Sequence, residues 1–197
     1  MKTYGQYCGL AKALDRVGDR WSLLIVRELL LGPARFSDLR DALPGIATNL
    51  LTERLRALEG DGIVRRAPLG RPVRAVVYEL TEVGHGLDDA VSALVRWGGR
   101  WMTAGPAPGE AFQPRWLVVA LRSLLAGDAP PAVSGEVTVS AAGEAITVAA
   151  TGGRRSVELG AAESPGAVVE ADPPTVLGIA SGVLTLAAAR RSRGARV

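Results

Sequence analysis

The chain has 197 residues, enough for one large domain or for two small domains that each bury a core. Its one cysteine (Cys8) and one histidine (His85) exclude an intrachain disulfide, a zinc finger and any metal site dominated by Cys and His ligands. We therefore expect neither a metal nor a cofactor. The formal net charge of +3 is too small to indicate a nucleic-acid partner by itself.

The N-terminal segment up to Trp21 lacks the apolar run of a secretory signal, so we expect a cytoplasmic protein in which Cys8 is a free thiol. Lys12 follows Cys8 by about one helical turn. If this segment is helical, Lys12 would lower the pKa of the thiol. The alternative is that Cys8 is a small apolar residue buried under a contact between two subunits.

Apolar residues at helical spacing predict four helices in the first third of the chain. The second predicted helix ends at a Gly-Pro pair and the third at a Pro-Gly pair. The four helices are centred on Leu10–Val17, Leu23–Leu31, Phe36–Leu43 and Ala47–Gly60.

The fourth predicted helix has two chemically different faces. Leu51, Leu55 and Leu58 share one face and should point into the core. The outward face carries Asn49, Thr52, Glu53 and Arg56, and Thr48 lies at the helix start. Asn and Arg side chains contact adenine and guanine edges in the major groove, and backbone N–H groups at a helix start attract phosphate. The alternative is an ordinary solvated polar face.

The next two runs, Val64–Ala67 and Ala75–Leu80, predict a hairpin around a Pro-Gly loop. The order of helix, short turn, helix and hairpin describes a winged helix-turn-helix. No acidic residue interrupts the hairpin between Arg65 and Arg74, so we expect its charges to be locally uncompensated and suited to phosphate or the minor groove. The alternative is a solvated charged turn. The hairpin arginines are Arg65, Arg66, Arg71 and Arg74.

A long helix should start near Thr81, and the Gly- and Pro-rich segment Thr103–Glu110 should follow it as a linker. We therefore expect one domain over residues 1–104, a linker over 105–112 and a second domain over 113–197. Residues 1–104 have a net charge of +3, residues 105–189 of −4, and the last eight residues add four arginines. The basic excess therefore lies in the first domain and in the C-terminal tail.

The second domain begins with a predicted helix over Gln113–Leu125. Strands joined by antiparallel hairpins should follow over Val133–Val139, Ala145–Ala149 and Ser156–Leu159, with a further strand near Ala167–Glu170. Helices begin at Pro173. This order predicts an α+β domain in which helices cover one face of an antiparallel sheet.

The longest uncharged stretch, Pro173–Ala189, could be read as a membrane anchor followed by a basic tail. It opens with two prolines and is shorter than the roughly 20 residues of a membrane span. Two buried helices are the preferred interpretation, and we expect no membrane association.

Several motifs of the first domain resemble those of the HxlR-type winged-helix regulators, which are relatives of the multiple-antibiotic-resistance regulators. The similarity covers about residues 7–102. Its motifs are Cys8-Gly-Leu-Ala-Lys-Ala-Leu-Asp, Gly18-Asp-Arg-Trp21-Ser-Leu-Leu, Arg27-Glu-Leu-Leu-Leu-Gly-Pro, Arg35-Phe-Ser-Asp-Leu, Leu43-Pro-Gly-Ile, Asn49-Leu-Leu-Thr-Glu-Arg-Leu, Gly62-Ile-Val and Tyr78-Glu-Leu-Thr.

The resemblance implies a homodimeric bacterial transcription factor that binds a double-stranded DNA operator. The family commonly has Ser where this chain has Ala47, so a helix cap is lost unless Thr48 replaces it. The implied DNA-binding residues are Thr48, Asn49, Thr52, Arg54, Arg56, Arg35, Ser37, Arg71 and Arg74.

The resemblance also implies a dimer interface formed by the first and last helices of the domain, and a redox-sensing role for Cys8, since several members sense oxidants or quinones through an N-terminal cysteine. With no second cysteine, a disulfide at Cys8 would join two subunits or take up a small thiol. The interface residues are Leu10, Leu14, Leu87, Val91, Leu94, Trp97 and Trp101, each of which could instead belong to the core.

Residues 113–191 look like the sterol carrier type-two fold, notably in Val168-Val-Glu-Ala-Asp172-Pro-Pro-Thr-Val-Leu followed by Gly182-Val-Leu. That resemblance implies an apolar tunnel for a hydrophobic small molecule. Ordinary core is the alternative for each lining residue. The candidates are Trp116, Val119, Val137, Ile146, Val148, Leu177, Ile179 and Leu184.

The sequence thus predicts an α+β regulator, most simply a repressor, whose DNA affinity responds to a hydrophobic effector in the C-terminal domain or to thiol modification. It shows no constellation for acid-base or nucleophilic catalysis, so we do not expect an enzyme. The alternative is a lipid-binding carrier protein whose N-terminal half mediates protein association. Salt-dependent DNA binding would distinguish the two.

Overall fold

A computed structural model describes residues 3–69, 75–102, 106–107, 109–125, 130, 133–192 and 194–197. The chain forms two compact units, residues 1–91 and 92–197. Their boundary falls within helix α6 (Asp88–Gly98), before the expected linker. The functional assignment of the two domains stays a prediction.

The first unit is built from short helices whose apolar residues face inward. Gly18 is the C-cap of the first helix, and a Cβ at this position would lie 2.5 Å from the carbonyl oxygen of Leu14, so only glycine fits there. The first four helices match the predicted segments closely. The helices are α1 (Gly9–Val17), α2 (Ser22–Leu29), α3 (Phe36–Ala42), α4 (Thr48–Gly60) and α5 (Glu82–His85).

Long aliphatic side chains from α2, α3 and α4 form the core of this unit. Each such side chain stabilises the fold by about 1.5–3 kcal/mol when fully buried. The largest of them are Ile25, Leu29, Leu39, Leu51, Leu55 and Leu58.

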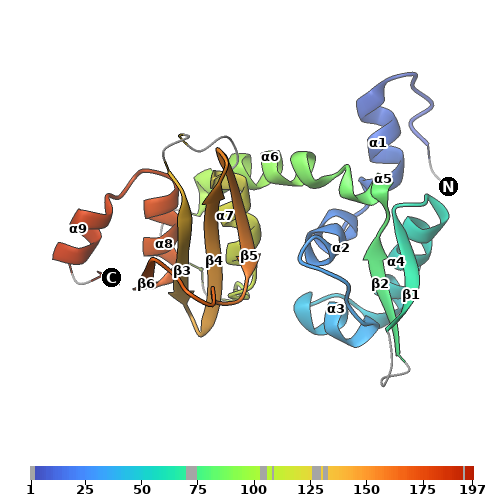
Figure 1. The fold of residues 1–197 in the computed structure, drawn as a ribbon. Helices are drawn as coiled ribbons and strands as arrows, with labels where there is room; N and C mark the ends of the chain where they lie inside the picture. The colour runs from blue at the N-terminus through green and yellow to red at the C-terminus, as the bar shows by residue number, and fades with distance from the viewer. Residues whose placement is uncertain are drawn as a thin grey trace. The chain divides into compact units, whose positions relative to one another are not determined.

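Strands β1 (Val64–Leu69) and β2 (Ala75–Leu80) pair antiparallel as the predicted hairpin, with Arg65 opposite Glu79. Ala34 adds a short bridge to Tyr78 and so ties the segment before α3 to the hairpin. Figure 1 shows α2, α3 and α4 grouped beside the hairpin. The prediction of a winged helix-turn-helix is thereby confirmed.

The single long helix predicted from Thr81 is wrong, because α5 ends at His85 and α6 begins at Asp88. Thr81 caps α5 by accepting a hydrogen bond from the Gly84 N–H. Gly84 lies so close to the backbone of Ile63 that a Cβ would be 2.2 Å from its carbonyl oxygen. Helix α5 therefore packs closely against the base of the wing. It is one turn long and is separate from α6.

The second unit contains a five-stranded sheet in the order β5-β4-β3-β6-β7. Figure 1 shows α7 and α8 behind this sheet. The helices and the 3-10 turn are η1 (Gly99–Trp101), α7 (Trp116–Leu125), α8 (Pro173–Ala180) and α9 (Leu186–Arg191). The strands are β3 (Gly135–Ala141), β4 (Glu144–Thr151), β5 (Arg154–Leu159), β6 (Ala167–Ala171) and β7 (Ala195–Arg196).

The prediction of an α+β domain is confirmed, but the sheet is mixed rather than wholly antiparallel. β3 and β6 pair in parallel, with Val139 opposite Val169, and the short strand β7 was not predicted. Adjacent strands can be inferred from turn residues, whereas the β3–β6 pair joins strands that are separated by β4 and β5. Within the described part of the chain, no helix is long and apolar enough to cross a membrane.

Candidate nucleic-acid interface

Helix α4 is held firmly by the side that faces the core. Leu51, Leu55 and Leu58 are fully buried, as the helical spacing predicted. The turn before α4 passes through Gly45 in the left-handed region (φ 89°), which favours glycine. The ring of Trp21 lies close to this turn, 3.9 Å from where a Gly45 Cβ would stand.

The opposite face of α4 is polar and open to solvent. Thr48, Asn49 and Arg56 are exposed, and Thr52 is half-buried with its hydroxyl donating to the Thr48 carbonyl at 2.9 Å. Among the described residues, no hydrogen bond or ion pair engages the side chain of Arg56 or of Asn49. Both side chains are therefore available to bind a partner.

The start of α4 has no side-chain cap. Ala47 occupies the N-cap, and Thr48 is the first helical residue rather than a replacement cap. The first backbone N–H groups of a helix have no intrahelical acceptor and carry a partial positive charge. With nothing from the described residues capping them, they suit a phosphate oxygen.

Arg54 points away from this open face. Only 15% of its side chain is exposed, and its guanidinium contacts the Asp19 carboxylate at 3.1 Å and the Arg20 carbonyl at 3.3 Å. A third contact joins it to Glu53 at 3.0 Å. These partners favour a role in holding α4 against the α1–α2 junction rather than the predicted contact with DNA.

Arg35 and Ser37 are both exposed at the start of α3. The Asp38 carboxylate accepts hydrogen bonds from the Arg35 backbone N–H at 2.9 Å and from the Ser37 hydroxyl at 3.3 Å. Asp38 thus fixes the backbone at the start of α3 and leaves the Arg35 side chain exposed.

The sequence predicted that the charges of the wing arginines are locally uncompensated. For Arg65 and Arg66 this prediction is wrong. Arg65 pairs with Glu79 at 2.7 Å, and Arg66 pairs with Glu59 of α4 at 2.9 Å. The hydrogen bond from Arg66 to Glu59 raises the pKa of Arg66, whose guanidinium also lies 5.5 Å from the ring centroid of Tyr78. The carboxylates come from other elements, so the local sequence could not reveal them. Arg71 and Arg74 lie outside the described residues.

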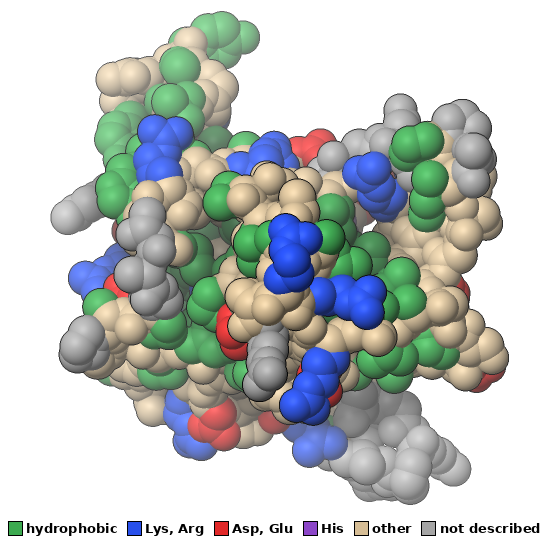
Figure 2. Space-filling view, turned by 90° about the vertical axis from the view of Figure 1, so that its left-hand side faces the viewer, with side chains coloured by type: hydrophobic (Ala, Val, Ile, Leu, Met, Phe, Trp, Pro, Cys, Tyr) green, Lys and Arg blue, Asp and Glu red, His purple; other side chains and the backbone are tan. Residues whose placement is uncertain are grey.

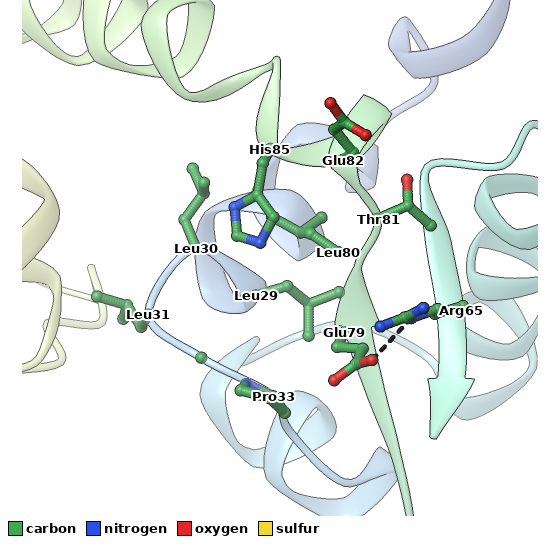
Figure 3. Close-up of a pocket in the computed structure, with 11 residues that line it drawn as sticks. Leu29, Leu30, Leu31, Pro33, Arg65, Glu79, Leu80, Thr81, Glu82 and His85 are labelled. Carbon is green, nitrogen blue, oxygen red and sulfur yellow. Dashed lines mark hydrogen bonds and ion pairs between the residues drawn. The ribbon is translucent and has the colours of Figure 1, made fainter.

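A hollow of about 670 Å³ lies beside the base of the wing (Figure 3). Leu29, Leu30 and Leu80 line its apolar side, and the Arg65–Glu79 pair and His85 lie around it. His85 is exposed. No local motif indicates this hollow, because its residues come from α2, the segment after α2, both strands and α5.

Cys8 occupies the N-cap position of α1 and its side chain is exposed. Backbone N–H groups of Ala11 and Leu10 lower the pKa of the thiol. The sequence suggested that Lys12 lowers the thiol pKa. In the structure, the backbone N–H groups at the start of α1 lower it instead. The alternative, a cysteine buried under a contact between two subunits, is not tested by a single chain and stays a prediction.

The predicted dimer residues fall into two groups. Leu10 (68% exposed), Leu14 and Leu94 are open to solvent. Trp97 and Trp101 are also exposed, and their rings pack edge to face with 4.6 Å between the ring centroids. The Arg100 guanidinium lies near both rings. Leu87 is half-buried, and Val91 is 4% exposed, so Val91 belongs to the core instead.

Two of the eight predicted ligand-pocket residues are buried in the second unit, and the other six are half-buried. Val137, Val148 and Ile146 share one face of β3 and β4, and Ile146 and Val119 are buried. Trp116, Leu177, Ile179 and Leu184 are half-buried. A hollow of about 580 Å³ in this unit is lined by none of these residues but by polar groups such as Glu144, Glu170 and Arg196. The apolar tunnel therefore stays a prediction, with ordinary core as its alternative.

Comparison with known proteins gives one family match. The model of the HxlR-like helix-turn-helix family matches residues 16–106. An uncharacterized HTH-type transcriptional regulator of Synechocystis sp. is 37% identical over 50% of this chain and 73% of its own length. The uncharacterized HTH-type transcriptional regulator YvaP of Bacillus subtilis is 36% identical over 46% of this chain and 84% of its own length.

Among solved structures, the reduced form of the transcriptional regulator YodB from B. subtilis is 33% identical, with a TM-score of 0.40. The match covers 53% of this chain and all of YodB. Each of these matches thus accounts for about half of the present chain.

Proposed function

The chain belongs to the HxlR-like helix-turn-helix family of DNA-binding transcriptional regulators, and from this premise we propose that it is a homodimeric repressor whose α4 reads an operator. One observation carries the proposal: buried leucines fix α4 while its open face presents Asn49 and Arg56. Asn recognises adenine and Arg recognises guanine through paired hydrogen bonds in the major groove.

The uncapped start of α4 supports the same placement. Thr48 and the N–H groups of the first helical turn would bind a phosphate next to the bases that Asn49 contacts. Arg35 and Ser37 at the start of α3 would bind DNA phosphates on the other side of the major groove. Arg71 and Arg74 would reach the flanking groove from the wing.

Two subunits are part of the proposal because a pair of recognition helices must match two half-sites about 34 Å apart. The exposed apolar side chains of Leu10 and Leu14 on α1 would be covered by the partner subunit. Modification of Cys8, which precedes α1, would then alter the spacing of the two α4 helices and release the DNA.

Regulation by a hydrophobic molecule in the C-terminal unit, and the likeness of that unit to sterol carriers, stay predictions. Of the candidate lining residues, Val119 and Ile146 are buried and the other six are half-buried. Thiol chemistry at Cys8 is the better supported signal, because the thiol is exposed and its pKa is lowered.

The test is binding of fluorescent duplex DNA as a function of salt, using a genomic fragment selected by the protein from sheared DNA and a scrambled duplex of equal length. We expect tight binding to the selected fragment, and a linear fall of log K with log salt. Equal affinity for both duplexes would contradict sequence reading by α4. No binding to either duplex at low salt would contradict the proposed function altogether.

A further inference from the structure

The second unit has a basic corner that the winged helix-turn-helix does not use. We define it by Arg190 and Arg191, in the last turn of α9, and Arg196 on β7. All three side chains are exposed. Figure 2 looks onto the side that carries α9 and shows Lys and Arg side chains projecting near the middle of this face.

The basic corner belongs to the folded sheet domain and is not a loose tail. Thr185 caps α9 by accepting a hydrogen bond from the Ala188 N–H at 3.1 Å. The Gly194 N–H donates to the Ala189 carbonyl at 2.9 Å, and β7 pairs with β6. Ala189 and Ala195 are buried beneath this surface. The arginines are thus presented at defined positions, which lowers the entropy cost of binding.

The charges of Arg190 and Arg191 have no carboxylate partner among the residues that the structure describes. Arg196 is different, because Glu170 stands opposite it in the β6–β7 register, and Glu144 and Asp172 line the same hollow as Arg196. These carboxylates offset its charge. Arg190 and Arg191 therefore dominate the basic corner. Their position in the last turn of α9 also suits the negative end of the helix dipole, but this effect leaves the guanidinium groups facing water.

The rest of the second unit would be repelled by a polyanion. Residues 105–189 contain four basic and eight acidic residues, whereas the last eight residues contain four arginines. The opposite charges are thus segregated, and only the C-terminal end of this unit suits an anionic partner.

We propose that the basic corner binds the phosphate backbone of DNA flanking the operator, as a contact additional to α4 and the wing. This inference rests on the proposed function, because it requires DNA that the first unit already binds. The covalent connection gives the flanking phosphates a high effective concentration, so a weak contact suffices. The contact is independent of sequence, since guanidinium groups on phosphates read no bases.

The test compares the salt dependence of DNA binding for wild-type protein and for the variant Arg190→Gln/Arg191→Gln. Each lost phosphate contact lowers the slope of log K against log salt by about 0.9, so the slope should fall by about 2 per chain. The fall should appear on a long duplex that includes flanking DNA, and should vanish on a short duplex that covers the two half-sites alone.

The matched control is Arg154→Gln/Arg155→Gln, which removes two exposed charges from the β4–β5 end of the sheet, at its opposite edge. This control should keep the wild-type salt slope. The variant Arg190→Lys/Arg191→Lys, which retains both positive charges, should also keep it. The inference is overturned if wild-type protein binds DNA and Arg190→Gln/Arg191→Gln has an unchanged slope on the long duplex. It is also overturned if that variant keeps its DNA slope but loses binding to phosphatidylserine vesicles. Failure of wild-type protein to bind any duplex would instead overturn the proposed function.

Discussion

Arg54 and Arg56 lie on the same helix but have different surroundings. Arg54 is enclosed by Asp19, Glu53 and the Arg20 carbonyl, whereas Arg56 extends from the open face of α4. A guanidinium that is already engaged must break its contacts before it binds a base, but a free one need not. Of the two, Arg56 is therefore the better candidate for base recognition.

Replacement of Arg56 by Ala should weaken binding to the selected operator fragment by about 1–3 kcal/mol and reduce discrimination against scrambled DNA. Fluorescence anisotropy with both duplexes measures the effect. Glu163→Ala, which changes an exposed side chain of the second unit, is the control and should not weaken binding. Unchanged affinity and discrimination in Arg56→Ala would rule out this base contact.

Asp19→Asn should weaken operator binding in the same way as Arg54→Gln, because either change releases α4 from the α1–α2 junction. The double variant should be no worse than Arg54→Gln alone, since that change already removes the ion pair with Asp19. If Arg54 instead binds phosphate, Asp19→Asn would free its charge and strengthen binding. In that case Arg54→Gln alone would lower the salt slope by about 0.9.

The thiol of Cys8 should react with iodoacetamide at a lower pH than an ordinary cysteine does, because helix N–H groups lower its pKa. A lowered folded pKa favours the native state above the unfolded-state pKa, and the contribution disappears as pH falls through the folded pKa. Alkylation rates measured against pH, in buffer and in denaturant, should show the midpoint moving upward when the protein unfolds. Equal midpoints would contradict the helix effect.

At the scale of elements, ion pairs connect α4 to two neighbouring parts of the first unit. Arg54 joins it to the α1–α2 junction, and Glu59 joins it to Arg66 on β1. Tyr78, which lies beneath Arg66, bridges in turn to Ala34 before α3. The recognition helix and the wing should therefore move together when either one is displaced.

The wing arginines should contribute unequally to DNA binding. Arg71→Ala should weaken binding to operator and scrambled DNA alike and lower the salt slope by about 0.9. Arg65→Ala should have a smaller effect because Glu79 already neutralises this side chain. The measurement is the salt titration of both variants. A larger loss for Arg65 than for Arg71 would show that the Arg65–Glu79 pair opens on DNA.

The elements that the sequence predicted well are those whose evidence is local. Leucines at 51, 55 and 58 placed the inner face of α4, and Gly- or Pro-containing turns placed the β3–β4–β5 meander. The features that it missed depend on distant residues: the carboxylates opposite the wing arginines, the parallel β3–β6 pair and the break after His85. Single-chain periodicity also could not separate the buried Val91 from the exposed Leu94.

At the scale of the whole molecule, dimerisation and DNA binding should be lost together. Leu10→Glu/Leu14→Glu places two charges on the exposed apolar side of α1, and should yield monomers with unchanged folding. Because one subunit binds only one half-site, operator affinity should fall by more than tenfold.

Analytical ultracentrifugation and anisotropy on the same samples would check both effects. The control Leu24→Glu changes an exposed leucine on α2 and should leave the dimer intact. Monomers that retain full operator affinity would contradict the proposed arrangement of two half-sites.

The parallel pairing of β3 with β6 also bears on how fast each half of the chain folds. In the first unit, the hairpin pairs β1 with β2, which follow each other directly in the sequence. In the second unit, β4 and β5 lie between β3 and β6 in the sequence. Pairing over a longer stretch of chain costs more loop-closure entropy and is slower. After dilution from denaturant, the β1–β2 hairpin should therefore form before β6 pairs with β3. For a short interval, a refolding molecule would have its wing while the sheet of the second unit is still incomplete.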